Sequence, residues 1–306
     1  MKREHKNTPG EKKHLHDYSP AFIERTATLK EISEILNSGR NVLIVGQPKS
    51  GKTTIVSELK RTLAESHFEC VLLELSQVPM TPEFYSVFAI KEMKKEFSKR
   101  KPETDAEKHV SEIISESERE IEGELLKVKP DHSRMIESVR DAMNKISARL
   151  KQQKKKLLVI IDDGEELLNL ENFPQVKSVL DMAGIENGES SEAPLFLITT
   201  SYSRAFGTSL SHFEKVNLKK YNDEEIKEFR DYHKIKHHWE TLLNLTDRHP
   251  FVLNALARAM REKESLEEAV ILEFLNPDSA TFQFFSAWVN DALSKARGAT
   301  LQKAIL

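Results

Sequence analysis

The amino-acid sequence predicts an α/β protein of three layers, in which helices cover both faces of a parallel sheet and a small all-α domain follows. Three observations predict this class. Short apolar runs of strand length alternate with segments of helical periodicity, and from residue 219 onward only helical patterns remain. Glycine accounts for 10 of the 306 residues, less than half of the usual ~7%, which disfavours an all-β protein with many turns.

The predicted elements begin with a helix, a strand and a second helix. Residues 22–37 repeat apolar side chains at helical spacing, and residues 41–45 (NVLIV) form a continuous apolar run between turn residues. Helical spacing resumes from Thr53 onward. Continuous runs of this kind are typical of strands that are buried on both faces of a parallel sheet. Further strands are expected at residues 70–75, 157–161 and 195–199, with a weaker fifth at 213–218.

Charge and composition divide the chain into three parts. We expect a disordered basic arm at residues 1–17, a sheet domain at 18–220 and a helical lid domain at 221–306. Residues 76–156 separate the second and third predicted strands, and the centre of this interval, residues 102–126, carries nine acidic and two basic residues. We interpret the interval as an exposed, charged helical insertion with a basic stretch at each end.

The composition excludes several classes of protein. The formal net charge is −3, so that binding to nucleic acid would require a local basic patch. The single cysteine, Cys70, excludes an internal disulfide. The charged N-terminal stretch lacks the apolar core of a secretory signal, and no run approaches the ~20 apolar residues of a membrane helix. We therefore expect a cytoplasmic protein that has no membrane partner.

One motif indicates a specific chemistry. Residues 46–53 read GQPKSGKT and fit the phosphate-binding pattern G-x-x-x-x-G-K-[ST] at every fixed position, between a predicted strand and a predicted helix. Glycines let the backbone close around an anion, and the N–H groups of the loop and of the helix N-terminus face the phosphates. We expect Lys52 to reach the β- and γ-phosphates of ATP, and the Thr53 hydroxyl to bind Mg²⁺. The predicted nucleotide contacts are Gly46, Gln47, Pro48, Lys49, Ser50, Gly51, Lys52, Thr53 and Thr54.

Acidic residues follow the third predicted strand. The run LLVII ends in Asp162 and Asp163. An acid at the end of a buried strand is the usual Mg²⁺ partner of a phosphate-binding loop. We therefore assign Asp162 to the metal and Asp163 to the polarisation of the attacking water, as a catalytic residue beside Lys52. Glu165 and Glu166 are alternatives for the role of Asp163.

Polar residues also follow the fourth predicted strand. Thr199, Thr200 and Ser201 stand at its end, where they either contact the γ-phosphate or only form a turn. Thr200 is the residue that we assign to the nucleotide, and Arg204 supplies a positive charge nearby.

Taken in order, FIERTATL, the phosphate-binding loop, LLVIIDD, LITTS and HPFVL resemble the STAND-type P-loop ATPases, in particular the archaeal ATPase-like, AAA+-related family. Phe22, Arg25 and Leu29 match the F-x-x-R-x-x-x-L start that lines the adenine site in that family, so the resemblance implies that Phe22 and Arg25 contact ATP. Pro250 matches a proline that senses the nucleotide, although residues 247–249 (DRH) replace the usual glycine-rich approach. The resemblance also implies an ATP-driven switch.

The motifs and the resemblance together predict a Mg-ATP-binding and ATP-hydrolysing switch ATPase of the STAND or AAA+-like type. We expect slow turnover that rises on self-association or on binding of a protein partner to residues 76–156. We expect this stimulation because the sequence does not single out one arginine of the chain as the arginine finger. The candidates are Arg204, Arg258 and Arg261. The expected cofactors are ATP and Mg²⁺.

Three other functions stay open. A DNA-associated AAA+ ATPase of the origin-recognition or transposition type is less favoured by the net charge, but the basic stretches KEMKKEFSKRK and KQQKKK leave nucleic acid as a possible partner. A small-molecule kinase would require an arginine-rich lid, and no arginine cluster follows Leu218. A nucleotide-binding scaffold without turnover is disfavoured because the lysine, threonine and paired aspartates are all present.

Overall fold

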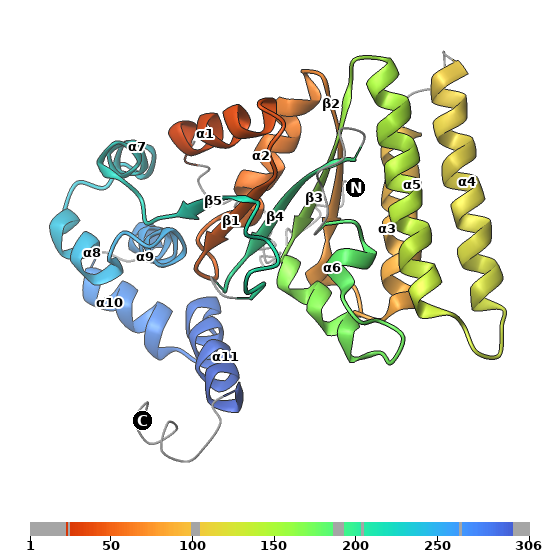
Figure 1. Cartoon of the computed structure of the whole chain (residues 1–306). Coiled ribbons are helices and arrows are strands. Elements are labelled where there is room, and N and C mark those ends of the chain that lie inside the picture. Colours follow the sequence, from red (N-terminus) through yellow and green to blue (C-terminus); the bar gives the residue numbers. More distant parts are fainter. Residues whose placement is uncertain are drawn as a thin grey trace, which may run out of the picture. The chain divides into compact units, whose positions relative to one another are not determined.

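The computed structural model describes residues 23, 25–98, 105–185, 193–202, 205–262 and 265–295. These residues form two compact units. The sheet unit comprises Arg25–Asn222 and Asp247–Phe251, and the helical unit contains Asp223–Thr246 and the described residues from Val252 onward. Figure 1 shows the elements of both units. The predicted class, a three-layer α/β fold of the P-loop NTPase kind with a helical C-terminal region, is confirmed.

The sheet unit is built on five parallel strands in the order β2-β3-β4-β1-β5. Val45 pairs with Thr200 and Glu74 pairs with Asp162, so the polar residues that follow the apolar runs meet at one edge of the sheet. All five predicted runs are strands; β1 to β4 supply apolar side chains to both covered faces, whereas the edge strand β5 buries Val216 and Leu218 on one face only. Their bounds are Val42–Gly46 (β1), Phe68–Glu74 (β2), Lys156–Asp162 (β3), Leu195–Thr200 (β4) and Glu214–Leu218 (β5).

Helices cover the two faces of this sheet (Figure 1). One face packs against α1 (Thr26–Asn37) and α2 (Lys52–Ala64), and the other against α3 (Pro82–Phe97) and α5 (His132–Gln152). Alternate residues of a strand divide between the two cores, because successive side chains point to opposite faces. Val42 and Ile44 of β1 therefore belong to the first core, and Leu43 and Val45 to the second.

The interval that we interpreted as an insertion contains three helices. Met135, Ile146 and other apolar side chains of α5 are buried in the core, so α3 and α5 form a regular layer of the fold. Only α4 (Asp105–Leu125) answers to the expected exposed and charged element, although its Val110 and Ile114 pack on the same core. The short helices η1 (Leu75–Gln77), η2 (Gly164–Asn172) and α6 (Val179–Met182) complete the unit.

The helical unit has its own apolar core. Phe229, Leu242 and Leu256 are fully buried in it, and the rings of Phe229 and Trp239 stack at 6.5 Å. Among the described residues, no helix has the length and apolar character needed to cross a membrane. The helices are α7 (Asp223–His233), α8 (Trp239–Thr246), α9 (Pro250–Glu262), α10 (Leu266–Val270), the π-helical turn η3 (Ile271–Leu275) and α11 (Ala280–Lys295).

Candidate functional site

The phosphate-binding motif forms the loop between β1 and α2. A side chain at Gly46 would place its Cβ 2.6 Å from Ser50 Oγ and 3.0 Å from Leu218 Cβ, so only glycine fits where the loop leaves the strand. Gly51 has φ +96° and caps α2 at its N-terminus. Such a backbone conformation favours glycine. The two fixed glycines of the motif are therefore required by the geometry of the loop.

Lys52, the first residue of α2, turns its ammonium into the site. Its side chain is 6% exposed. Nζ donates to the carbonyl oxygens of Gly46 (3.0 Å) and Gln47 (3.2 Å) and to Ser201 Oγ (2.9 Å). Burial lowers the pKa of Lys52, while the neighbouring carboxylates, Glu165 foremost, act in the opposite direction.

The acid that ends β3 meets the threonine of the loop. Thr53 Oγ1 donates to Asp162 Oδ2 at 2.6 Å, and Thr199 Oγ1 donates to Asp162 Oδ1 at 2.5 Å. Asp162 and Thr199 are 2% and 0% exposed. Both carboxylate oxygens of Asp162 therefore accept hydrogen bonds inside a nearly dry site, which fixes the orientation of this side chain.

Asp163 stands where β3 turns into η2. Its backbone has φ +54°, which is uncommon for a residue other than glycine, and its N–H donates to Thr199 Oγ1 at 3.0 Å. Burial, followed by the charge of Asp162, raises the pKa of Asp163, and a hydrogen bond from Ser76 opposes this shift. The next residue must be glycine, because a Cβ at Gly164 would lie 2.4 Å from Ile198 Cγ2.

The two alternative acids, Glu165 and Glu166, have different hydrogen-bond partners in the structure. Glu165 Oε1 accepts the N–H of Ser201 at 3.0 Å, so this residue, which the sequence offered as an alternative to Asp163, lies beside the polar end of β4. Glu166 instead accepts from the side chain of Asn169, one turn along η2. Of the three polar residues after β4, Thr199 binds Asp162 and Ser201 binds Lys52.

The Thr200 hydroxyl makes a local turn. It accepts the N–H of Tyr202 at 3.2 Å and approaches the Tyr202 carbonyl oxygen at 3.3 Å. A nucleotide contact by Thr200 stays a prediction. Phe22 and Arg204 lie outside the described residues.

Two further residues of the family resemblance lie in the sheet unit. The Arg25 guanidinium donates to the carbonyl oxygen of Lys219 at 2.8 Å and lies 4.9 Å from the ring centre of Tyr221. Arg25 therefore holds the segment that follows β5, and direct contact with ATP stays a prediction. Pro250 begins α9, and its predicted role as a nucleotide sensor stays equally open.

His249, which the sequence analysis mentioned only as a departure from the family pattern, hydrogen-bonds the backbone of Pro48 in the loop. Burial lowers the pKa of this imidazole. No sequence signal indicated the contact, because about 200 residues separate the two partners and only the folded sheet unit joins them.

A cavity of about 570 Å³ lies beside the loop. This volume is within the usual range of small-molecule sites. Gly46, Gln47 and Ser201 line it together with Lys219 and Lys220, so that its polar lining is suited to an anion.

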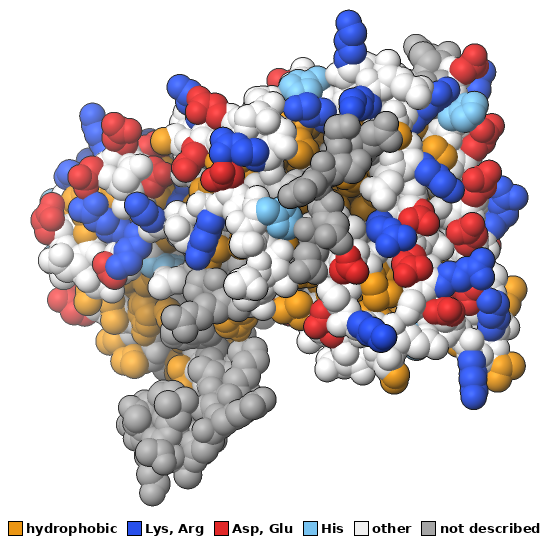
Figure 2. All heavy atoms as spheres, viewed as in Figure 1, with side chains coloured by type: hydrophobic (Ala, Val, Ile, Leu, Met, Phe, Trp, Pro, Cys, Tyr) orange, Lys and Arg blue, Asp and Glu red, His pale blue; other side chains and the backbone are white. Residues whose placement is uncertain are grey.

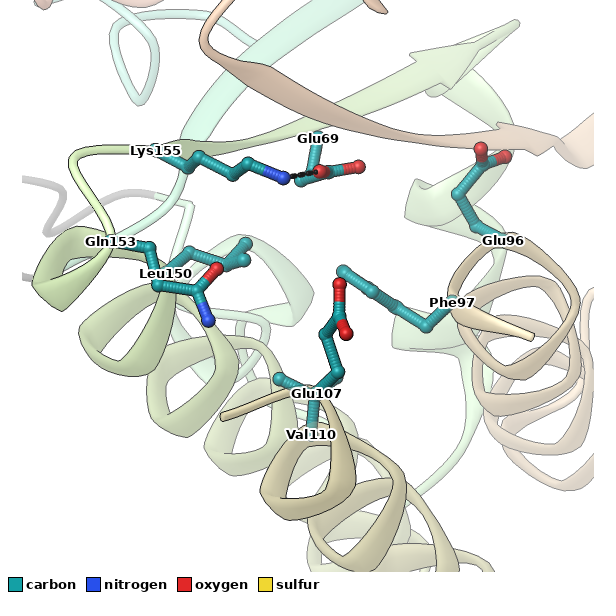
Figure 3. A pocket seen from close by; sticks show the side chains of 8 residues that line it. All are labelled: Glu69, Glu96, Phe97, Glu107, Val110, Leu150, Gln153 and Lys155. Carbon is teal, nitrogen blue, oxygen red and sulfur yellow. Dashed lines mark hydrogen bonds and ion pairs between the residues drawn. The ribbon is translucent and has the colours of Figure 1, made fainter. Parts of the chain in front are cut away.

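A second, smaller cavity is lined by several acidic side chains (Figure 3). It measures about 80 Å³ and lies among α3, α4, α5 and the starts of β2 and β3. Glu69, Glu96 and Glu107 line it, with Lys155 donating to Glu69 at 2.6 Å. Glu96 is also paired with Lys60 at 2.8 Å, and acidic side chains still outnumber basic ones around this cavity, which disfavours a phosphate there.

Residues 21–172 match the family model of the AAA ATPase domain. This part of the chain is an AAA ATPase domain. Such a domain binds and hydrolyses ATP, which confirms the predicted nucleotide and reaction class. The narrower assignment to STAND-type ATPases goes beyond this match.

Two solved structures are similar to this chain. A Walker-type ATPase of Pyrococcus abyssi is 14% identical, with 90% of this chain and 75% of that chain covered and a TM-score of 0.59. The ORC2 protein of Aeropyrum pernix in its ADP form is 13% identical, with coverages of 83% and 69% and a TM-score of 0.48. The first likeness shows the shared fold of the AAA ATPase domain and its helical region. A search of curated proteins gave no match.

Proposed function

We propose that this AAA-type ATPase is a Mg-ATP-dependent switch, and that Lys52, Thr53, Asp162 and Asp163 form its catalytic site. The observation that carries the proposal is the 2.6 Å hydrogen bond between Thr53 Oγ1 and Asp162 Oδ2. It joins the hydroxyl next to the loop lysine to the acid at the end of β3, which are 109 residues apart in the sequence. If Thr53 only formed a turn and Asp162 only capped a helix, no hydrogen bond between them would be expected.

The chemistry of this pair fits Mg²⁺. The cation prefers oxygen ligands and in ATPases takes one or two protein groups beside water and phosphate. Thr53 offers a hydroxyl and Asp162 a carboxylate, and among the described residues no cluster of three or more His, Cys, Asp or Glu side chains could hold a metal by itself. When bound, Mg²⁺ supplies positive charge to the phosphate oxygens as the terminal phosphoryl group is transferred.

Side chains of the protein account for the other parts of the reaction. Lys52 supplies a fixed positive charge to the phosphates in a site where burial strengthens electrostatic interactions. Asp163 accepts a proton from the water as the water oxygen bonds to the γ-phosphorus and the bond to the leaving ADP breaks. Its raised pKa brings its proton affinity closer to what a general base requires. Thr199 holds Asp162 and the backbone of Asp163 in place.

The charge distribution supports a protein partner or self-association over nucleic acid. Lysines of both basic stretches form ion pairs with glutamates of the same unit: Lys94 with Glu118 at 2.6 Å, and Lys155 with Glu69 at 2.6 Å. A nucleic-acid phosphate would compete with these carboxylates. Figure 2 shows acidic and basic side chains interspersed over the helices of the sheet unit on the face in view.

The test measures ATP turnover at several protein concentrations, with and without duplex DNA, for the parent and for Lys52→Ala. We expect slow, Mg²⁺-dependent turnover in the parent that rises with protein concentration, and none in the variant. Activation that requires DNA and falls steeply with salt would favour the DNA-associated alternative. Absence of ATP binding in the parent would contradict the proposal.

A further inference from the structure

Glu165 lies in η2, two residues after the paired aspartates, and is connected to the loop lysine through one residue. Its Oε1 accepts the backbone N–H of Ser201 at 3.0 Å. The hydroxyl of the same serine accepts from Lys52 Nζ at 2.9 Å. Acid, serine and lysine thus form a continuous chain of contacts within the sheet unit.

Ser201 requires such a partner because it follows the last paired residue of its strand. The register of β4 with β1 ends at Thr200, which is paired with Val45. Beyond that point the strand ladder no longer fixes the backbone, and a half-buried N–H needs another acceptor. Glu165 provides this acceptor and so fixes the residue whose hydroxyl meets the lysine.

Glu165 also acts on Lys52 through its charge. Three carboxylates face this ammonium, those of Glu165, Asp163 and Asp162, and the charge of Lys49 opposes them. Glu165 stabilises the charged form of Lys52 most among the three. A buried ammonium needs such compensation to stay protonated.

One atom of Glu165 is left without a partner. Among the described residues, Oε2 is buried and accepts no hydrogen bond, whereas both oxygens of Asp162 accept hydroxyl donors. A buried acceptor of this kind is costly and is rarely retained without a reason.

We propose that Glu165 is a positioning residue for the phosphate-binding lysine: it holds Ser201 by a hydrogen bond, and the Ser201 hydroxyl in turn holds the Lys52 ammonium in place. The proposal rests on the proposed function, in which Lys52 binds the phosphates of ATP. It assigns Glu165 no contact with the attacking water, which is left to Asp163.

Two substitutions separate the hydrogen bond from the charge. Glu165→Ala removes both, while Glu165→Gln keeps an oxygen that accepts the Ser201 N–H and removes only the charge. Glu171 is the matched control, since it lies in the same helix and its Oε1 accepts the N–H of Val179 at the same distance of 3.0 Å. Neither atom of that contact faces Lys52.

The readouts are ATP affinity by calorimetry and saturated turnover. We expect Glu165→Ala to weaken ATP binding by about tenfold or more, the scale of a hydrogen bond to a charged group, and Glu171→Ala to leave affinity within about threefold. Glu165→Gln keeps an acceptor for the Ser201 N–H and should recover most of the affinity that Glu165→Ala loses.

A double-mutant cycle tests whether Glu165 acts through Ser201. Ser201→Ala should weaken ATP binding, and its combination with Glu165→Ala should cost less than the sum of the two losses, as expected for residues in one chain of contacts. Full additivity would contradict the chain.

The outcomes distinguish this proposal from the proposed function. A parent that does not bind ATP overturns both. A parent that binds ATP while Glu165→Ala matches Glu171→Ala overturns the positioning role alone. Normal affinity with lost turnover in Glu165→Gln would make Glu165 the proton acceptor and would equally overturn it.

Discussion

Replacement of Thr199 by valine removes a hydroxyl from the centre of the site and almost nothing else. The two side chains have nearly the same shape, so no cavity forms around a residue that is 0% exposed. Two hydrogen bonds disappear, one to Asp162 Oδ1 at 2.5 Å and one from the Asp163 N–H at 3.0 Å. The variant therefore leaves one buried acceptor and one backbone donor without partners.

The magnitude follows from these two groups. Each unpaired buried polar group costs about 1–3 kcal/mol, so the free energy of unfolding should fall by about 2–5 kcal/mol. Loss of this donor should also leave the Asp162 carboxylate free to reorient, which weakens its interaction with Mg²⁺. We therefore expect a lower melting temperature together with a higher Mg²⁺ concentration for half-maximal turnover.

The assay compares thermal unfolding and Mg²⁺ titrations of ATPase activity for Thr199→Val and Thr199→Ser. Serine keeps both hydrogen bonds, so it should restore most of the Mg²⁺ dependence. Thr246→Val is the control, because that buried hydroxyl donates to carbonyl oxygens of its own helix, those of Leu242 and Leu243. A Thr199→Val protein with parental stability and parental Mg²⁺ dependence would refute the reasoning.

The remaining predictions concern the same edge of the sheet. Lys52→Ala should abolish tight ATP binding in calorimetry, and unchanged affinity would contradict the assignment of the loop. Asp162→Asn should lose Mg²⁺-dependent affinity, whereas Asp163→Asn should bind ATP and lose turnover. Parental turnover in Asp163→Asn would contradict its role as base. As the pH is lowered, turnover of the parent should begin to fall at a higher pH than it would with a base of ordinary carboxylate pKa, because burial raises the pKa of Asp163. Gly164→Ala should lower the free energy of unfolding by about 1–3 kcal/mol through overlap with Ile198, and a parental melting curve would exclude that contact. ATP should outcompete GTP, since no N-K-x-D sequence is present to read guanine; equal affinities would refute this prediction.

The sequence predicted those features that are encoded locally. Continuous apolar runs indicated β1 to β4, since only a strand with helices on both faces needs apolar side chains at successive positions, whereas the alternating edge strand β5 gave a weaker signal. The spacing of Gly46, Gly51 and Lys52 indicated the phosphate-binding loop, because backbone geometry and charge are set within eight residues. For the same reason the run before Asp162 indicated an acid at a strand end.

Long-range contacts could be found only in the tertiary structure. We interpreted residues 76–156 as an exposed insertion because the surface charge of α4 dominates the composition there. In the structure, α3 and α5 of this interval form a buried layer. Ser76 contacts Asp163 because β2 lies beside β3. The sequence of a single strand does not specify which strands lie next to it in the sheet.

The sequence by itself determined the strands, the loop and the class of chemistry, since these depend on residue type and on spacing over a few positions. The tertiary structure decided which polar residues share one site. Thr199 is joined to Asp162, and Glu165 is joined through Ser201 to Lys52, because separate segments end at the same edge of the sheet. Hydrogen bonds between such segments depend on strand order and register, which no local pattern specifies.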